Sequence, residues 1–145
     1  MNDIERAIII AVNAHQGQKE KAGTPYVFHP LGLMLKQNSQ EARIVAVLHD
    51  VVEDTDINLA YLAEAGFSDS VLCAIELLTH DKNTEYMDYI EALSHNSIAK
   101  SVKLADLADN LDISRIPNPT EKDYQRLEKY KKAYKFLMDA DKESM

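Results

Sequence analysis

Apolar residues recur every three or four positions along most of the chain, the spacing that places side chains on one face of an α-helix. Few segments alternate apolar and polar residues as a half-buried strand would. The glycines and prolines that interrupt the pattern, four of each, gather mainly at residues 17–30 and 117–119. The pattern therefore predicts an all-α fold, a single bundle of about eight helices that spans residues 1–145 as one domain.

Local signals predict where these helices begin and end. Ser39, Ser68 and Thr120 are candidate N-cap residues, and Pro30 suits a first helical turn because its missing N–H needs no partner there. The predicted helices cover residues 2–15, 30–35 and 40–53, a short segment from Asp56 or Asn58 to Gly66, residues 71–78 and 84–93, a segment from Asn96 or Ser97 to 111, and residues 121 onwards.

The first and last helices carry apolar stripes that predict their buried faces. In the first helix the stripe consists of Ile4, Ala7, Ile8, Ala11 and Val12. In the last helix it consists of Tyr124, Leu127, Tyr130, Tyr134 and Leu137. This tyrosine-rich stripe could also support a homodimer, so the oligomeric state stays open. The single cysteine, Cys73, lies in an apolar helical segment and is predicted to be a small core residue.

Size, charge and cysteine content exclude several classes of protein. A domain of 145 residues buries roughly 68–70% of its unfolded surface. One cysteine cannot form an intrachain disulfide, which fits a cytoplasmic location, and no apolar run is long enough to span a membrane. The net charge of −8 disfavours a nucleic-acid polymer or an anionic membrane as partner. A small anionic substrate stays compatible, because a metal and a few basic side chains can outweigh the global field locally.

Candidate chemistry is concentrated in residues 44–55, IVAVLHDVVEDT, where an apolar helix ends in a cluster of acids. His49, Asp50, Glu53 and Asp54 are related by steps of three and four, so an imidazole and three carboxylates share one helix face. Carboxylates grouped beside apolar residues repel one another and are costly to bury without a compensating charge. A divalent metal is the simplest such charge. An ordinary helix histidine beside a solvated acidic helix end is the alternative.

Two further residues can complete a metal site. His29 follows the loop of residues 16–28, where a capping or surface role is the alternative. Asp106 lies in the apolar run VKLADLADNL, where it could instead face water near Lys103. Mixed nitrogen and oxygen ligands suit a borderline or hard divalent ion such as Mn²⁺, Fe²⁺, Zn²⁺ or Mg²⁺. The candidate ligands are then His29, His49, Asp50 and Asp106.

Three stretches, in this order, resemble the motifs of a known family: AHQGQKEKAGTPYVFHP, LHDVVEDT and VKLADLADNLD, at residues 14–30, 48–55 and 102–112. They are similar to those of the HD-domain metal-dependent phosphohydrolases. Within this family the chain most resembles the hydrolase domain of the RelA/SpoT proteins and the small single-domain alarmone hydrolases. The resemblance covers about the first 115 residues and includes nothing like a synthetase or regulatory domain.

The resemblance implies a reaction and a role for each site residue. The reaction would be hydrolysis of the 3′-pyrophosphate of guanosine 3′,5′-bis(diphosphate) to GDP or GTP and pyrophosphate. Glu53 and Asp54 would be the catalytic residues that act on the attacking water, and Lys21 and Asn110 would bind substrate. The metal, usually Mn²⁺, would be bound by His29, His49, Asp50 and Asp106.

Other residues are candidates for substrate contacts on their chemistry alone. Lys103, Arg115 or Lys19 could neutralise phosphate charge. Tyr86 or Tyr89 could stack on a base, although tyrosines at this spacing are also typical of the edge of a core.

Two positions depart from the family pattern. Alarmone hydrolases usually have an arginine before the loop lysine, and it packs against guanine, whereas this chain has Glu20. They usually have another arginine after the metal aspartate, whereas this chain has Leu107. An acid neither stacks as a guanidinium does nor attracts phosphate. The alternatives to alarmone hydrolysis are therefore hydrolysis of a different small nucleotide and a non-catalytic HD domain that binds a nucleotide.

Overall fold

The computed structural model describes residues 2–20 and 22–144, and the side chains within residues 2–20, 22–114 and 116–139. In this part of the chain the fold is all-α, with eight α-helices and one short 3₁₀ turn, η1 (Ile113–Arg115). The predicted fold class and the expected number of about eight helices are confirmed. The helices are α1 (Asp3–Ala14), α2 (Phe28–Leu35), α3 (Gln40–Asp54), α4 (Leu59–Glu64), α5 (Asp69–Leu78), α6 (Tyr86–Leu93), α7 (Ser97–Asn110) and α8 (Glu121–Ser144).

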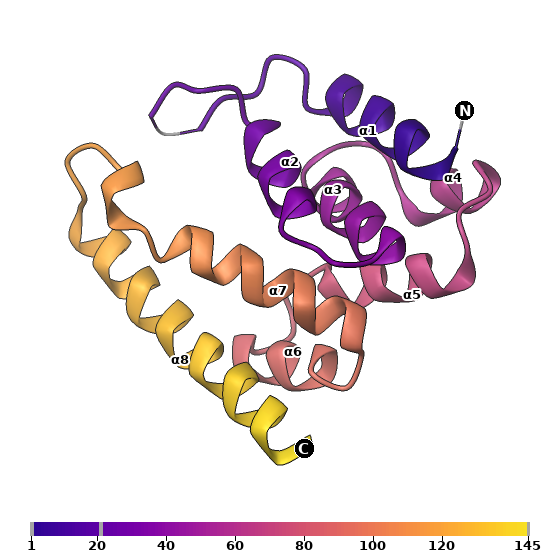
Figure 1. Cartoon of the computed structure of the whole chain (residues 1–145). Coiled ribbons are helices and arrows are strands. Elements are labelled where there is room, and N and C mark those ends of the chain that lie inside the picture. Colours follow the sequence, from indigo (N-terminus) through magenta and orange to yellow (C-terminus); the bar gives the residue numbers. More distant parts are fainter. Residues whose placement is uncertain (1, 21, 145) are drawn as a thin grey trace.

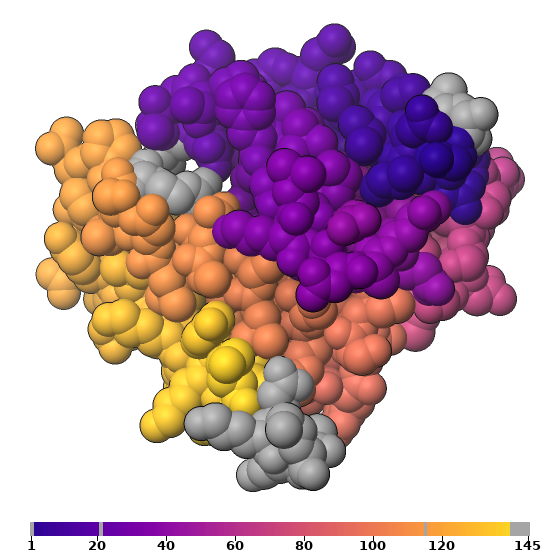
Figure 2. Space-filling model, in the orientation of Figure 1, coloured from indigo at the N-terminus to yellow at the C-terminus, as the bar shows by residue number. Residues whose placement is uncertain are grey.

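Helix α3 forms the centre of the bundle, because its apolar side chains are buried continuously from Ile44 to Val51. Helices α1, α2, α5 and α7 pack around it, and α8 packs along α7 at the far edge from α1 (Figure 1). In the space-filling view the indigo N-terminal helix and the yellow part of α8 lie on opposite sides of one continuous body (Figure 2). The acidic end of α3 lines one cavity together with residues of α2 and α7. None of the described helices is long and apolar enough to cross a membrane.

Side-chain caps start most of the helices. Ser39 and Ser68 each accept a hydrogen bond from the backbone N–H three residues later, as predicted. Thr120 does the same at the start of α8. Helices α4 and α7 are capped by Asn58 and Asn96, which settles two starts that the sequence pattern left open.

Three helices begin two residues away from their predicted starts, and one of them, α5, begins at Asp69 instead of residue 71 because it follows directly on its cap Ser68. Helix α2 begins at Phe28 rather than at Pro30, because backbone bonds from Phe28 to Pro25 and from His29 to Tyr26 already form a turn. His29 therefore lies in the first turn of a helix and not at the end of a loop. Helix α6 begins two residues later than predicted, after a cap by the preceding glutamate side chain.

Three residues predicted to be in the core are exposed. Val12 and Tyr124 are 40% and 53% exposed, and Cys73 lies on the outer face of α5. Helices α1 and α8 lie at the edges of the bundle, so each buries a narrower stripe than its apolar spacing suggested. The other residues of the two predicted stripes are buried or half-buried.

Helix α2 offers a matched test of the core. Leu33→Ala is expected to lower the free energy of unfolding by about 2–5 kcal/mol, because Leu33 is 1% exposed and its loss leaves a cavity. Leu35→Ala, on the same helix at 77% exposure, should change it by less than about 0.5 kcal/mol. Urea unfolding followed by circular dichroism measures both, and equal effects would contradict the packing described.

Candidate active site

Three helices bring the four predicted metal ligands together: His29 from α2, His49 and Asp50 from α3, and Asp106 from α7. All four residues are buried, so the alternatives that placed His29 or Asp106 at the surface are wrong. His29 Nε2 lies 2.8 Å from Asp106 Oδ1 and 3.9 Å from Asp50 Oδ2. His49 Nε2 lies 3.2 Å from Asp50 Oδ1. The four side chains form one cluster, called here the His–Asp cluster.

Each imidazole of the His–Asp cluster is held through its second nitrogen. His49 Nδ1 donates a hydrogen bond to the Ala46 carbonyl at 2.9 Å, and His29 Nδ1 lies 2.5 Å from Asp109 Oδ2. A histidine that ligates a metal usually engages its other ring nitrogen with a carbonyl or carboxylate, which fixes the tautomer and ring orientation. The donor set and these outer contacts therefore fit a divalent cation bound through the two Nε2 atoms and the two aspartates.

In this structure the imidazoles and carboxylates contact one another directly. Within the described residues, no group of three or more His, Cys, Asp or Glu side chains is already arranged to hold an ion. Burial alone would lower the pKa of His29, but hydrogen bonding to Asp106 and the charges of Asp106 and Asp50 outweigh it and raise the pKa to about 9. His29 is thus protonated at neutral pH in this arrangement, and Nε2 carries a proton where a ligand needs a lone pair.

Metal binding is therefore expected to release a proton from His29 and to strengthen as the pH rises. Below the raised pKa of about 9, the apparent association constant for Mn²⁺ should increase about tenfold per pH unit. The stability of the metal-free protein should depend on pH in the opposite direction. The protonated His29 stabilises the fold fully below its ordinary pKa of 6.5, and this contribution is lost as the pH rises through about 9. Calorimetry in buffers of different ionisation enthalpy counts the released protons, and a pH-independent association constant would contradict the assignment.

Glu53 and Asp54 lie at the end of α3 beside the His–Asp cluster and line the same cavity. The pKa of each carboxyl is raised, first by partial burial and then by the charge of Asp50. Tyr26 donates hydrogen bonds to Asp50 Oδ2 at 2.9 Å and to Asp54 Oδ2 at 3.4 Å, which orients both carboxylates. A carboxylate with a raised pKa that still reaches the cavity is suited to accept a proton from water.

A cavity of about 310 Å³ opens beside the His–Asp cluster, whose members His29, Asp50 and Asp106 line it while His49 does not. Three predicted substrate residues also line it: Lys103, Asn110 and Tyr86. Lys103 Nζ lies 3.3 Å from Asp106 Oδ2, and Asn110 Nδ2 donates a hydrogen bond to Asp106 Oδ1 at 3.1 Å. Burial would lower the pKa of Lys103, but the charge of Asp106 outweighs it and holds the pKa above its usual range. Lys103 is therefore a fixed cation at the edge of the cavity.

The two tyrosines of α6 have different surroundings. Tyr89 is buried and its hydroxyl donates to the Leu78 carbonyl at 2.6 Å, so the core-edge interpretation is confirmed for Tyr89. Both tyrosines line the cavity, but Tyr86 is less buried than Tyr89, and Lys129 Nζ lies 4.5 Å from the ring centroid of Tyr86. The Tyr86 hydroxyl has no hydrogen-bond partner among the described residues. Of the two tyrosines, Tyr86 is the one positioned to meet a ligand.

Two predicted substrate residues cannot be placed in this cavity. Lys21 lies outside the described residues, and so does the side chain of Arg115, whose backbone forms part of η1. Their contacts with phosphate stay predictions.

Four lining residues were not predicted as site residues: Tyr26, His80, Lys129 and Tyr130. His80 Nε2 donates to the Thr84 carbonyl at 2.8 Å, and its ring packs against Tyr89. The place of Tyr26 inside the first motif, three residues before His29, was a usable signal. Lys129 and Tyr130 lie on α8, beyond the three motifs. The pattern of residues there predicted a helix but gave no sign of a functional site.

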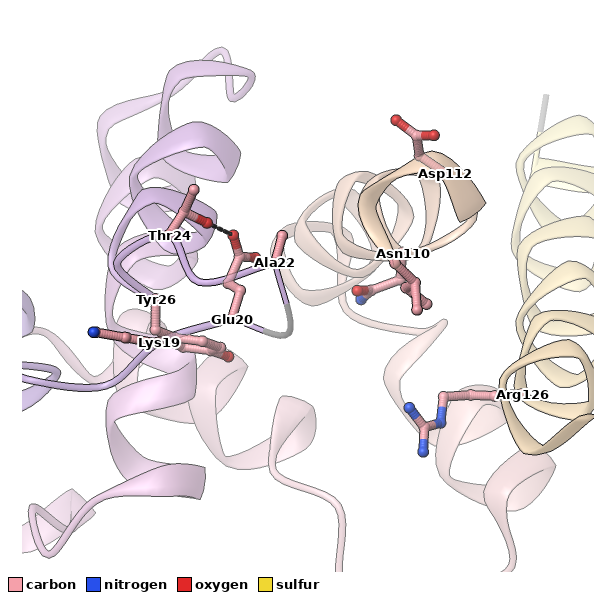
Figure 3. A pocket seen from close by; sticks show the side chains of 9 residues that line it. Lys19, Glu20, Ala22, Thr24, Tyr26, Asn110, Asp112 and Arg126 are labelled. Carbon is pink, nitrogen blue, oxygen red and sulfur yellow. Dashed lines mark hydrogen bonds between the residues drawn. The ribbon is translucent and has the colours of Figure 1, made fainter. Parts of the chain in front are cut away.

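A second cavity of about 510 Å³ adjoins the first, and the two share Glu20, Tyr26 and Asn110. Figure 3 shows the loop residues Glu20 and Ala22 facing Asn110 across this space, with Arg126 projecting from another element. The remaining lining residues are Lys19, Thr24, Asp112 and Ile116. Together the two cavities have the size of a site for a small ligand such as a nucleotide.

Known proteins resemble this chain in both sequence and structure. The guanosine-3′,5′-bis(diphosphate) 3′-pyrophosphohydrolase MESH1 of Mus musculus is 37% identical over 134 residues, 83% of this chain and 74% of that protein. The guanosine-3′,5′-bis(diphosphate) 3′-pyrophosphohydrolase of Aquifex aeolicus is 32% identical over 121 residues. A solved structure described as a metazoan orthologue of SpoT that hydrolyses ppGpp superposes with a TM-score of 0.75 at 29% identity, covering 97% of this chain and 85% of that one. No family model matches the chain.

The fold and the His–Asp cluster define a helical domain of the HD type. Within that class, the chain belongs to the family of guanosine-3′,5′-bis(diphosphate) 3′-pyrophosphohydrolases, which confirms the resemblance seen in its motifs. The chain spans only 17% of the length of the matching proteins from Synechocystis and Aquifex aeolicus, but most of the length of the mouse protein.

Proposed function

We propose that this chain is a metal-dependent hydrolase that removes the 3′-pyrophosphate of guanosine 3′,5′-bis(diphosphate). The observation that supports this most strongly is the His–Asp cluster beside Glu53 and Asp54, within a cavity that also holds the cations Lys103 and Lys129. Metal ligands, proton acceptors and phosphate-binding cations are the three groups that hydrolysis of a phosphate ester needs. The names of the relatives support this substrate.

The reaction balances with water as the only co-reactant. The water oxygen forms a bond to the phosphorus next to the 3′ oxygen, and the bond between that phosphorus and the 3′ oxygen breaks. Glu53 or Asp54 takes a proton from the water, and the departing 3′ oxygen gains one, leaving GDP and pyrophosphate. Lys103 and Lys129 neutralise phosphate charge, while Tyr26 keeps Asp54 oriented toward the water.

The cofactor is proposed to be Mn²⁺, bound by the His–Asp cluster. When bound, the ion supplies Lewis-acid polarisation of a phosphate oxygen and of the attacking water. Two imidazoles with two carboxylates suit Mn²⁺ and also Fe²⁺, Zn²⁺ or Mg²⁺. Asp109 orients His29 for this role through the contact at Nδ1.

The test is release of GDP and pyrophosphate from guanosine 3′,5′-bis(diphosphate), with Mn²⁺ present and then chelated. We expect equimolar products that disappear with the chelator and return when Mn²⁺ is added in excess. Mg²⁺, Zn²⁺ and Fe²⁺, tested separately, would identify the preferred ion.

The same assay distinguishes the alternatives. Metal-dependent turnover of another nucleotide, without turnover of the guanosine compound, would keep the mechanism and replace the substrate. Glu20 and Leu107, where the family usually has arginine, are the departures that motivate a test of other nucleotides. Binding of nucleotide and Mn²⁺ without turnover of any compound would show that the chain is a non-catalytic binding domain.

A further inference from the structure

We propose that Glu20 selects the nucleobase, because its carboxylate accepts hydrogen bonds from a base edge that carries two adjacent N–H donors. Among the common bases, guanine has this edge. The inference rests on the proposed nucleotide hydrolysis and adds a specificity-determining residue to it. Its basis is the position of Glu20 between two cavities of different chemistry.

The two cavities suit different parts of a nucleotide. The smaller one is lined by His29, Asp50 and Asp106 of the His–Asp cluster together with Lys103 and Lys129, so the reacting phosphates belong there. The larger one contains none of the proposed metal ligands, and its lining combines the apolar residues Ala22 and Ile116 with polar groups. Apolar contacts for a flat face and polar contacts for an edge are what a nucleobase needs. The base therefore belongs in the larger cavity.

The Glu20 carboxylate is held in place at the boundary of these cavities. Thr24 Oγ1 donates a hydrogen bond to Glu20 Oε2 at 2.8 Å. The backbone supports the same geometry, since Glu20 N–H donates to the Thr24 carbonyl at 2.9 Å and Gly23 N–H donates to the Glu20 carbonyl at 2.8 Å. Figure 3 shows the side chain on the loop side of the cavity, facing Asn110 across it. A carboxylate restrained in this way can favour ligands with a matching edge at little cost in entropy.

A carboxylate can only accept hydrogen bonds at neutral pH, and this property decides which base it favours. Guanine presents N1–H and the 2-amino group side by side, so both carboxylate oxygens of Glu20 can be satisfied. Adenine and cytosine place a ring lone pair beside their amino group, and uracil places a carbonyl on each side of its one N–H. Each of those bases turns a lone pair toward Glu20. Glu20 is half-buried, so a base that turns a lone pair toward its carboxylate displaces water from it without replacing the hydrogen bonds, whereas guanine supplies two.

This arrangement explains how a family position that usually carries arginine can hold an acid. Arginine would contact the face of guanine, whereas Glu20 contacts its edge. Arg126, which projects from α8 into the same cavity, keeps a guanidinium near the base. The change at position 20 therefore exchanges one mode of base recognition for another.

The experiment compares three substrates: guanosine 3′,5′-bis(diphosphate) and its inosine and adenosine counterparts. In the wild type, kcat/KM should fall about 10-fold for the inosine compound, which lacks the 2-amino group, and about 100-fold for the adenosine compound. Glu20→Gln keeps the length of the side chain and an oxygen for Thr24, but it replaces one acceptor with a donor. It should lower kcat/KM for guanosine by about 10- to 100-fold and reduce the differences among the three bases.

Asp112→Asn is the matched control, because it removes the same charge from the wall of the same cavity. It should change kcat/KM for all three substrates by one common factor. If Glu20→Gln did the same, Glu20 would act only through its charge, and the inference would be overturned. A wild type that did not distinguish guanosine from inosine would overturn it without any variant. Absence of turnover for all three substrates in the wild type would instead contradict the proposed hydrolase function, and not the role of Glu20 alone.

Discussion

Asp106→Asn is expected to lower kcat/KM by at least about 10³-fold and to abolish Mn²⁺ binding at micromolar concentrations. Asp106 contacts His29 Nε2 and Asn110 through Oδ1 and Lys103 through Oδ2. Burial alone would raise the pKa of its carboxyl, but the hydrogen bond with His29 and the charge of Lys103 outweigh it and hold the pKa well below the usual range. Asparagine keeps the shape but supplies no anion to a metal, and it leaves the buried cation Lys103 without its counter-charge. The expected loss of activity therefore has two causes: the variant does not bind the metal, and the charge of Lys103 in the cavity is no longer balanced.

Calorimetric titration with Mn²⁺ and a pyrophosphate-release assay measure the two effects of Asp106→Asn separately. Asp109→Asn is the graded comparison, because Asp109 contacts the outer nitrogen of His29 and not the ligand position. It should weaken metal binding or activity by about 10- to 100-fold. A variant at Asp106 that bound Mn²⁺ as tightly as the wild type would show that the His–Asp cluster is not the metal site.

Glu53→Gln is expected to lower kcat by about 10²- to 10⁴-fold while Mn²⁺ binding is retained. Glu53 lines the cavity beside the cluster and is proposed to take a proton from water, whereas glutamine cannot accept it. Glu41→Gln is the matched control, since it makes the same change at an exposed position in the first turn of the same helix. Loss of metal binding together with activity in Glu53→Gln would assign Glu53 to the ligands instead.

The pH profile gives an independent test of Glu53. Partial burial and the charge of Asp50 raise the pKa of this carboxyl above its ordinary value of 4.5. The base form is lost as the pH falls through the pKa of Glu53, so kcat at saturating Mn²⁺ should show an acid limb, which lies at lower pH than the pKa of Glu53 in the metal-free protein because the bound ion favours the carboxylate. Glu53→Gln should lack this acid limb. A profile with the same limb in both enzymes would assign the titration to another group, such as Asp54.

The helices were predictable because each depends on residues close together in the chain. The caps Ser39 and Ser68 and the apolar spacing of residues 40–53 act within one or two turns: both caps are formed as predicted, and α3 begins at the predicted residue, while α5 begins two residues earlier than predicted. The same locality placed His49 and Asp50 on one face with Glu53. Where a helix start depended on a neighbouring loop, as at Phe28, the local pattern was wrong by two residues.

Exposure was less predictable than helix position. An apolar stripe shows which face a helix would bury, but the partner that covers it comes from elsewhere in the chain. Val12 and Tyr124 are exposed because α1 and α8 lie at the edges of the bundle, and Cys73 is exposed because the core lies on the other side of α5. Nothing within these segments distinguishes a covered face from an open one.

The sequence by itself determined the fold class, the helix order, the acidic end of α3 and, through three motifs, the family. Only the tertiary structure decided that His29 meets Asp106, 77 positions away, and that Asp109 and Tyr26 orient the cluster. It also placed Lys129 in the cavity, from a helix beyond the motifs. The physical reason is that helix formation is governed by neighbours in the chain, whereas a charged site is assembled from helices whose relative positions depend on packing of the whole core.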